Sequence, residues 1–156
     1  APHNYHRIHS MVAGEVREFA YEPGDLWTVS PLGVNWVPRL FASNERLTSY
    51  LHTFGGECAL VKVGAMVVGR IRVRYDELFS NCPGAVRVQK TLQVPFRVER
   101  GEELGRFELG STVILLFQPG QVNWDSVSVG QPVRLGMALG TFHYDLENVE
   151  PKANKS

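Results

Sequence analysis

The apolar residues of this chain come in short runs that are broken by glycine, proline and asparagine. Only residues 36–46 have a helical pattern, and Pro38 keeps that helix short. The pattern therefore predicts a mainly β fold, a barrel or sandwich of short antiparallel strands with one short helix. The strands are expected at residues 15–21, 57–63, 66–73, 86–98 and 112–117.

Two stretches, residues 98–105 and 129–136, share a loose pattern. Each has a polar turn with glycine and then a short strand that ends in glycine. Similar turns occur in biotinyl and lipoyl carrier folds, whose core is a flattened β sandwich. We therefore expect elements of such a hybrid sandwich in this fold.

The composition predicts one globular domain. The chain has 156 residues, 44% hydrophobic and 21% charged, which is enough to bury a core. We expect the domain at residues 1–146 and a frayed polar tail at 147–156. The net charge of zero argues against a nucleic-acid partner.

No apolar run reaches the roughly 20 residues that span a bilayer, and no signal peptide is recognisable. Membrane contact is therefore expected to be peripheral, or to use a segment outside this sequence.

The main chemical signal is Gly110-Ser111-Thr112, directly before an apolar run. Gly110 has no side chain, so its carbonyl carbon can be approached closely. The Ser111 hydroxyl can attack that carbonyl and convert the amide into an ester. Elimination from the ester would break the chain between residues 110 and 111 and leave a pyruvoyl group at residue 111. In an arbitrary sequence, Gly-Ser-Thr is more often a tight turn that enters a strand.

Five ordered segments change that interpretation. They are Tyr-His-Arg-Ile-His-Ser (5–10), Pro-Gly-Asp-Leu (23–26), Leu-Phe-Ala-Ser-Asn-Glu-Arg (40–46), Val-Gly-Ala-Met-Val-Val-Gly (63–69) and Leu-Gly-Ser-Thr (109–112). Together they resemble motifs of the phosphatidylserine decarboxylases. The segments extend from residue 5 to the cleavage motif, and the similarity continues to about residue 140.

The resemblance implies a pyruvoyl-dependent carboxy-lyase that converts phosphatidylserine to phosphatidylethanolamine and carbon dioxide in phospholipid biosynthesis. A zymogen would cleave itself between Gly110 and Ser111, and Ser111 would become the pyruvoyl cofactor. Decarboxylation leaves a carbanion, and a pyruvoyl carbonyl that forms a Schiff base with the substrate amine can take up its electrons, as pyridoxal phosphate does elsewhere. No pyridoxal phosphate and no metal are then expected. None of the lysines has a context typical of a cofactor lysine; they are Lys62, Lys90, Lys152 and Lys155.

The resemblance also implies the partners. They are the phosphatidylserine substrate, a membrane surface and the two subunits made by cleavage, and a homo-oligomer is compatible with it. The implied location is the cytoplasmic face of a bacterial inner membrane, or the mitochondrial inner membrane.

Three histidines, His3, His6 and His9, recur at every third residue near the start of the chain. A strand places such residues on alternating faces, so shared metal binding is disfavoured. His6 and His9 match the two functional histidines of the family, and histidine exchanges protons near neutral pH. By resemblance, His9 is the base that activates Ser111 during self-cleavage. His6 acts at the substrate carboxylate and protonates the carbanion after carbon dioxide leaves.

The acid that would orient the base histidine is missing from the expected motif. The family carries it in an upstream Ala-Asp-Gly segment, whereas this sequence opens directly on the Tyr-His-Arg motif, so we expect a fragment or an unusually short member. Self-processing would then be slow. The residues after His9, Ser-Met-Val-Ala-Gly (10–14), also depart from the family pattern, as does Asn4. The remaining candidates, by elimination, are Asp25, Asp76, Asp125 and Asp145, and each is better explained as a turn or surface residue.

A basic middle region could bind a lipid phosphate, although a solvated strand face is the simpler interpretation. Its members are Arg70, Arg72, Arg74, Arg87, Lys90, Arg97 and Arg100. Four apolar residues could line an acyl-chain groove, although a place in the core is the safer interpretation. They are Trp27, Trp36, Leu40 and Phe41.

Three other functions stay open. One is a related pyruvoyl decarboxylase of a free amino acid, since the electron sink does not select the head group. Another is a non-catalytic β-sandwich carrier or binding module, but such carriers display a lysine at a hairpin tip and nothing here matches. The third is an inactive truncated remnant, suggested by the missing acid.

Overall fold

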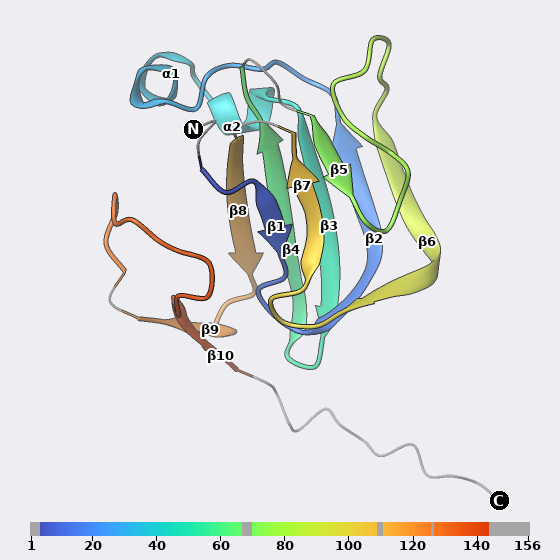
Figure 1. Cartoon of the computed structure of the whole chain (residues 1–156), viewed down its shortest axis with the longest axis vertical. Coiled ribbons are helices and arrows are strands. Elements are labelled where there is room, and N and C mark those ends of the chain that lie inside the picture. Colours follow the sequence, from blue (N-terminus) through green and yellow to red (C-terminus); the bar gives the residue numbers. More distant parts are fainter. Residues whose placement is uncertain (1–3, 67–69, 109–110, 126, 144–156) are drawn as a thin grey trace, which may run out of the picture.

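The computed structural model describes residues 4–66, 70–108, 111–125 and 127–143, except for the side chain of Ser111 (Figure 1). Within these residues the chain forms mainly short strands, with two short helices near the N-terminal third. In chain order the elements are β1 (Arg7–His9), β2 (Gly14–Glu22), α1 (Pro31–Trp36), α2 (Leu40–Ser43), β3 (Arg46–Thr53), β4 (Gly56–Gly64), β5 (Ile71–Val73), β6 (Val88–Val98), β7 (Glu103–Phe107), β8 (Ser111–Phe117), β9 (Val122–Trp124) and β10 (Gly140–Phe142).

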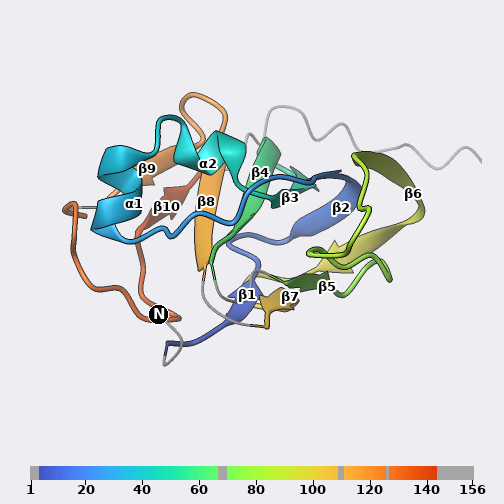
Figure 2. The ribbon, with the colours of Figure 1, turned by 90° about the horizontal axis from the view of Figure 1, so that it is seen from above.

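The strands form two facing antiparallel sheets and a separate hairpin. One sheet has the order β6-β2-β3-β4-β8, the other has the order β1-β7-β5, and β9 pairs with β10. Figure 2 shows the smaller sheet lying across one face of the larger one. The predicted mainly β, antiparallel fold is therefore confirmed in its sandwich form, because the sheets of the described residues do not close into a barrel.

The core lies between these two sheets. It is built by alternation along the strands, since successive side chains of a strand point to opposite faces. The larger sheet contributes Phe19, Leu47 and Leu60, and the smaller sheet contributes Ile71 and Leu104, all of them fully buried. The core therefore joins strands from most of the chain, which holds the short strand β1 and the start of β8 within one body.

The predicted single helix is replaced by two shorter ones. Helix α1 begins at Pro31, a position where the missing amide hydrogen costs nothing, and ends at Trp36. Pro38 interrupts the pattern, and Arg39 takes a left-handed backbone conformation (φ 55°) before α2 begins. Only α2 lies within the predicted helix at residues 36–46.

Five strands agree with the prediction, although β5 is much shorter than the predicted strand at 66–73, whose residues 67–69 lie outside the described part. The pattern did not predict β3, whereas the short strand expected to end at Gly105 in residues 98–105 overlaps β7. The second glycine-containing stretch, residues 129–136, forms turns but no strand, so the predicted strand there is wrong.

Two of the four apolar residues assigned to the core are also placed differently. Leu40 is buried, and Phe41 is half-buried. Trp27 is 46% exposed and Trp36 is 80% exposed, so the prediction of a core position is wrong for both.

Candidate active site

Ser111 is the first residue of β8, an edge strand of the larger sheet. Its backbone is in register with Gly64 of β4, and two residues further on Val113 is in register with Lys62. The predicted cleavage bond has its other side at Gly110, which lies outside the described residues, as does Leu109. The described part of the site is therefore the start of β8 and the elements around it.

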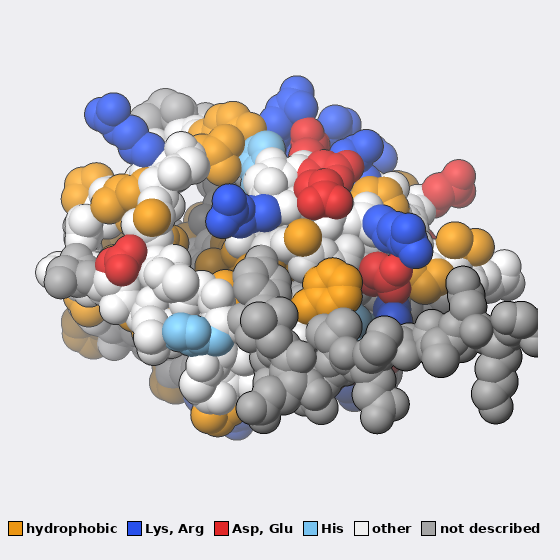
Figure 3. Space-filling view, turned by 90° about the horizontal axis from the view of Figure 1, so that it is seen from below, with side chains coloured by type: hydrophobic (Ala, Val, Ile, Leu, Met, Phe, Trp, Pro, Cys, Tyr) orange, Lys and Arg blue, Asp and Glu red, His pale blue; other side chains and the backbone are white. Residues whose placement is uncertain are grey.

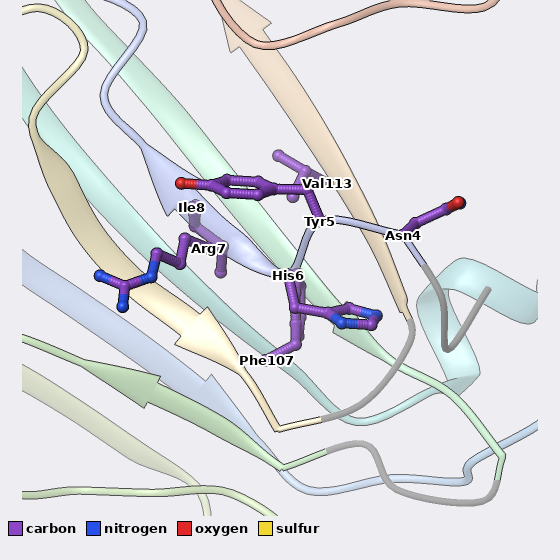
Figure 4. Close-up of a pocket in the computed structure, with 7 residues that line it drawn as sticks. All are labelled: Asn4, Tyr5, His6, Arg7, Ile8, Phe107 and Val113. Atoms are coloured by element: carbon purple, nitrogen blue, oxygen red, sulfur yellow. The ribbon is translucent and has the colours of Figure 1, made fainter.

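A pocket of about 140 Å³ lies beside β8, where β1 and β7 approach it. Figure 4 shows the His6 side chain pointing to the opposite side from those of Tyr5 and Arg7, as alternation along an extended segment requires. The pocket is lined by Asn4, Tyr5, His6, Arg7, Ile8, Phe107 and Val113. The structure thus brings His6 and a residue of β8 close to Ser111 into one pocket.

His6 is held in place by its backbone. The Phe107 amide donates a hydrogen bond to the His6 carbonyl oxygen (2.9 Å), which extends the β1–β7 pairing by one residue. The Nε2 atom of His6 is buried and has no hydrogen-bond partner among the described residues. A buried polar atom without a partner is costly, so such atoms are common where a ligand or a reaction uses them. His6 can therefore exchange a proton with a group in this pocket.

His9 lies at the other end of β1, where it is in register with Glu103. Its Nδ1 lies 2.7 Å from the Gly101 carbonyl oxygen, and its Nε2 lies 2.7 Å from the Tyr5 hydroxyl. A carbonyl oxygen only accepts hydrogen bonds, so Nδ1 carries a proton. In the neutral ring Nε2 is then the acceptor, and the Tyr5 hydroxyl donates to it.

The two predicted histidines therefore have different surroundings. His6 lines the pocket together with Val113, and its Nε2 has no hydrogen-bond partner within the described part of the chain, whereas both ring nitrogens of His9 are engaged. The roles given to them by resemblance stay predictions.

Comparison with known proteins identifies the family of this chain. Residues 1–141 match the sequence model of phosphatidylserine decarboxylase. The chain belongs to the phosphatidylserine decarboxylase family. It is 50% identical over 143 residues to a protein of Anaeromyxobacter sp. and 48% identical over 143 residues to one of Myxococcus xanthus, both named phosphatidylserine decarboxylase proenzyme. These matches cover 90% of this chain and 51% and 50% of the relatives.

A third relative with the same name, from Bordetella avium, is 42% identical over 153 residues, which cover 96% of this chain and 51% of that protein. The chain thus spans about half the length of the curated relatives it matches. No helix among its described residues is long and apolar enough to cross a membrane.

In this family member, no carboxylate contacts His6 or His9 within the described residues. Asp25 accepts a hydrogen bond from Trp27 Nε1 (3.2 Å), and Asp76 forms an ion pair with Lys90 (2.5 Å). Asp125 directly follows β9, where its amide donates to the Leu139 carbonyl oxygen (3.0 Å), and the fourth candidate, Asp145, lies outside the described residues. Asp25 and Asp76 thus have structural partners of their own.

Sequence reasoning missed Lys62, which is fully buried on the inner face of β4. Its Nζ donates hydrogen bonds to Ser49 Oγ and to the Leu60 carbonyl oxygen, and Ser49 also bonds the Tyr75 hydroxyl. Burial lowers the pKa of Lys62 to about 7. The position could have been recognised from the sequence, because Lys62 continues the inward alternation of Cys58 and Leu60.

The basic region is largely paired with carboxylates. Figure 3 shows basic and acidic side chains next to one another rather than in separate patches. Exposed pairs of this kind stabilise a fold little, but they neutralise the local charge. The ion pairs join Arg70 and Arg72 to Glu108, Arg74 to Glu102, Arg87 to Glu22, Lys90 to Asp76 and Arg97 to Glu15.

Proposed function

We propose that this chain carries the catalytic machinery of a pyruvoyl-dependent phosphatidylserine decarboxylase that is made as a self-cleaving zymogen. The observation that carries the proposal is the position of Ser111 at the start of β8, close to a pocket lined by His6, whose buried Nε2 has no hydrogen-bond partner among the described residues. The motif around Ser111 is the one expected for self-cleavage in this family. The domain would comprise residues 1–146, with a polar tail at 147–156.

The first step belongs to the chain itself. The Ser111 hydroxyl attacks the Gly110 carbonyl carbon, and the amide becomes an ester with a free amine at residue 111. A base then removes the α-proton of residue 111, and elimination releases the Gly110 carboxylate. The resulting dehydroalanine adds water and loses ammonia, which leaves a pyruvoyl group at residue 111. His9 is the proposed base for the initial attack, in which it takes the proton of the Ser111 hydroxyl, so its Nε2 must leave the Tyr5 hydroxyl during that attack.

The pyruvoyl group supplies an electron sink for the carbanion left by decarboxylation. No group of three or more His, Cys, Asp or Glu side chains in the described part of the chain is arranged to hold a metal ion, and the proposal uses none. His6 is the proposed acid that protonates the carbanion, because it lines the pocket and its buried Nε2 has no hydrogen-bond partner among the described residues. Phe107 and Val113 make part of the lining of that pocket apolar.

The proposed substrate is phosphatidylserine at a membrane surface, contacted peripherally. Support comes from three exposed apolar side chains in α1 and the loop before it, Trp27, Leu32 and Trp36, which are 46%, 71% and 80% exposed. Figure 1 shows α1 at the same end of the larger sheet as the start of β8. Tryptophan is favoured at membrane interfaces. In a cell this would be a bacterial inner membrane or a mitochondrial inner membrane.

Intact mass under denaturing conditions tests self-cleavage. The wild-type chain should separate into residues 1–110 and 111–156, and the second piece should react with carbonyl reagents and lack a free amino terminus. Ser111→Ala should stay whole, while Ser128→Ala, at a serine in a loop far along the chain, should cleave as the wild type does. Cleavage of Ser111→Ala at this bond would refute the proposal. Release of carbon dioxide from phosphatidylserine but not from free serine would show that the substrate is the phospholipid and not the free amino acid.

A further inference from the structure

Gly64, the strand partner of Ser111, lies just beyond the end of the β3–β4 ladder. Strand β3 begins at Arg46, which is in register with Val63, so β3 has no residue opposite Gly64. The loop before β3 pairs with the backbone of Gly64 instead. The Gly64 amide donates to the Glu45 carbonyl oxygen (2.8 Å), and the Gly64 carbonyl oxygen accepts a hydrogen bond from Asn44 Nδ2 (2.9 Å).

The Asn44 side chain uses both of its donor hydrogens and its acceptor oxygen. Besides the bond to Gly64, Nδ2 donates to the Trp27 carbonyl oxygen (2.8 Å), and Oδ1 accepts from the Trp27 amide (3.0 Å). Asn44 is completely buried. A buried amide with all its partners is rigid, because breaking any of these bonds leaves a polar group unpaired.

The segment that carries Trp27 is itself fixed against the loop before β3. The Asp25 amide donates to the Ser43 carbonyl oxygen (3.0 Å), and the Glu45 amide donates to the Asp25 carbonyl oxygen (2.8 Å). A Cβ atom at Gly24 would lie 2.3 Å from the Ser43 carbonyl oxygen, so only glycine allows this approach. Asn44 therefore links two closely packed loops to the end of β4.

We infer that Asn44 is a positioning residue for self-cleavage: it fixes the backbone of Gly64, and through the β4–β8 register it fixes the backbone at Ser111. The inference rests on the proposed function. Nucleophilic attack within a chain depends on the relative placement of the two atoms, and a displacement of about 1 Å can cost about 100-fold in rate. Asn44 touches neither reacting atom and acts only through Gly64.

The test compares two isosteric changes in the full chain. Asn44→Asp keeps the size and the acceptor for Trp27 but loses both donors. Gln121→Glu is the matched control, because Gln121 is 6% exposed and its Nε2 donates to the Gly55 carbonyl oxygen (2.6 Å) beyond the opposite end of β8. We expect Asn44→Asp to slow cleavage by about tenfold or more, and Gln121→Glu to change it by less than about twofold. Equal rates for both variants would overturn the inference.

A second measurement separates positioning from loss of stability and from failure of the proposed function. In a Ser111→Ala background, amide hydrogen exchange reports the β4–β8 ladder without any cleavage. Asn44→Asp should speed exchange at residues 62–64 and 111–113, and Gln121→Glu should speed it near residues 55–58 and 115–118. If the wild type never cleaves, the proposed function fails, and exchange still decides whether Asn44 holds this ladder. Unchanged exchange at residues 62–64 and 111–113 would overturn the inference in either case. If Asn44→Asp does not unfold cooperatively in denaturant, Asn44→Ser replaces it in both measurements.

Discussion

The Tyr5 hydroxyl lies 2.7 Å from Nε2 of His9, and the two rings stack with their centroids 5.6 Å apart. This contact occupies the ring nitrogen that His9 would need in order to take a proton. Two roles for His9 in self-cleavage follow from this contact. In the first, His9 gives up the contact and acts as the base; in the second, it keeps the contact and only supports the turn at Gly101.

Replacing Tyr5 by Phe tests these accounts. The variant keeps the stacked rings but removes the hydroxyl. Nε2 of His9 then has no hydrogen bond to break before it takes a proton, and a typical hydrogen bond is worth about 1 kcal/mol. If His9 is the base, cleavage should become faster by about fivefold, measured by quenched samples on a denaturing gel. Slower cleavage with unchanged thermal stability would show that the contact itself is needed.

The two histidines can be separated by their products. His9→Ala should leave the precursor uncut, because the nucleophile loses its base. His6→Ala should be cut but should lose decarboxylation by about 10²–10⁴-fold, the usual contribution of a general acid or base. Mass spectrometry follows the first reaction and release of carbon dioxide follows the second. The proposed roles would be reversed if His6→Ala stayed uncut and His9→Ala were cut.

Lys62 predicts a stability that depends on pH. Its ordinary pKa of 10.5 falls to about 7 in the folded chain, so between these pH values the unfolded chain binds more protons. Stability therefore rises with pH in this range, and from pH 7 to pH 9 the contribution of this group is about 2 kcal/mol.

Lys62→Met should remove this dependence while it fills a similar volume. Urea unfolding of both proteins at pH 7 and pH 9 measures it. The Met variant should be more stable than the wild type at pH 7, and the difference between them should shrink at pH 9. A constant difference at the two pH values would mean that Lys62 stays charged in the folded chain.

Gly24 predicts a steric cost. An added Cβ would lie 2.3 Å from the Ser43 carbonyl oxygen, a backbone atom that can move only with its loop. Gly24→Ala should therefore lower the free energy of unfolding by about 1–3 kcal/mol. Gly130→Ala is a comparison in which the space is open and only the positive φ of 83° opposes a side chain, so it should cost about 1–2 kcal/mol through backbone strain alone. Denaturant midpoints of the two variants give the comparison.

The sequence predicted those parts of the fold in which alternation was clean. Strand β4 was predicted because apolar residues dominate it, whereas β3 was missed because Ser49 takes an inward position between Leu47 and Leu51. The strand expected in residues 98–105 was predicted to end at Gly105, whereas β7 continues through that glycine to Phe107. That glycine is required by the neighbouring strand, since a Cβ there would meet the Arg72 carbonyl oxygen at 2.3 Å.

The candidate site, like the fold, could be predicted only in part from the sequence. Local motifs were sufficient to select Ser111, His6 and His9. They could not show that His9 is hydrogen-bonded to Tyr5, because that depends on side-chain packing across a turn. The role of Asn44 was equally hidden, since its partners Trp27 and Gly64 are 17 and 20 residues away in the chain.

The place of Ser111 at the very start of an edge strand has a consequence for assembly. Strand β8 meets β4 in seven successive residue pairs, and its Phe117 packs against Trp124 and Phe142, which follow it in the chain. A break just before β8 would leave all of these contacts in place, and an intramolecular strand pair would become an interface between two polypeptides. After such a break, two polypeptides would have to associate in order to form the fold. Its free energy of unfolding would then depend on protein concentration, unlike that of a single uncut chain.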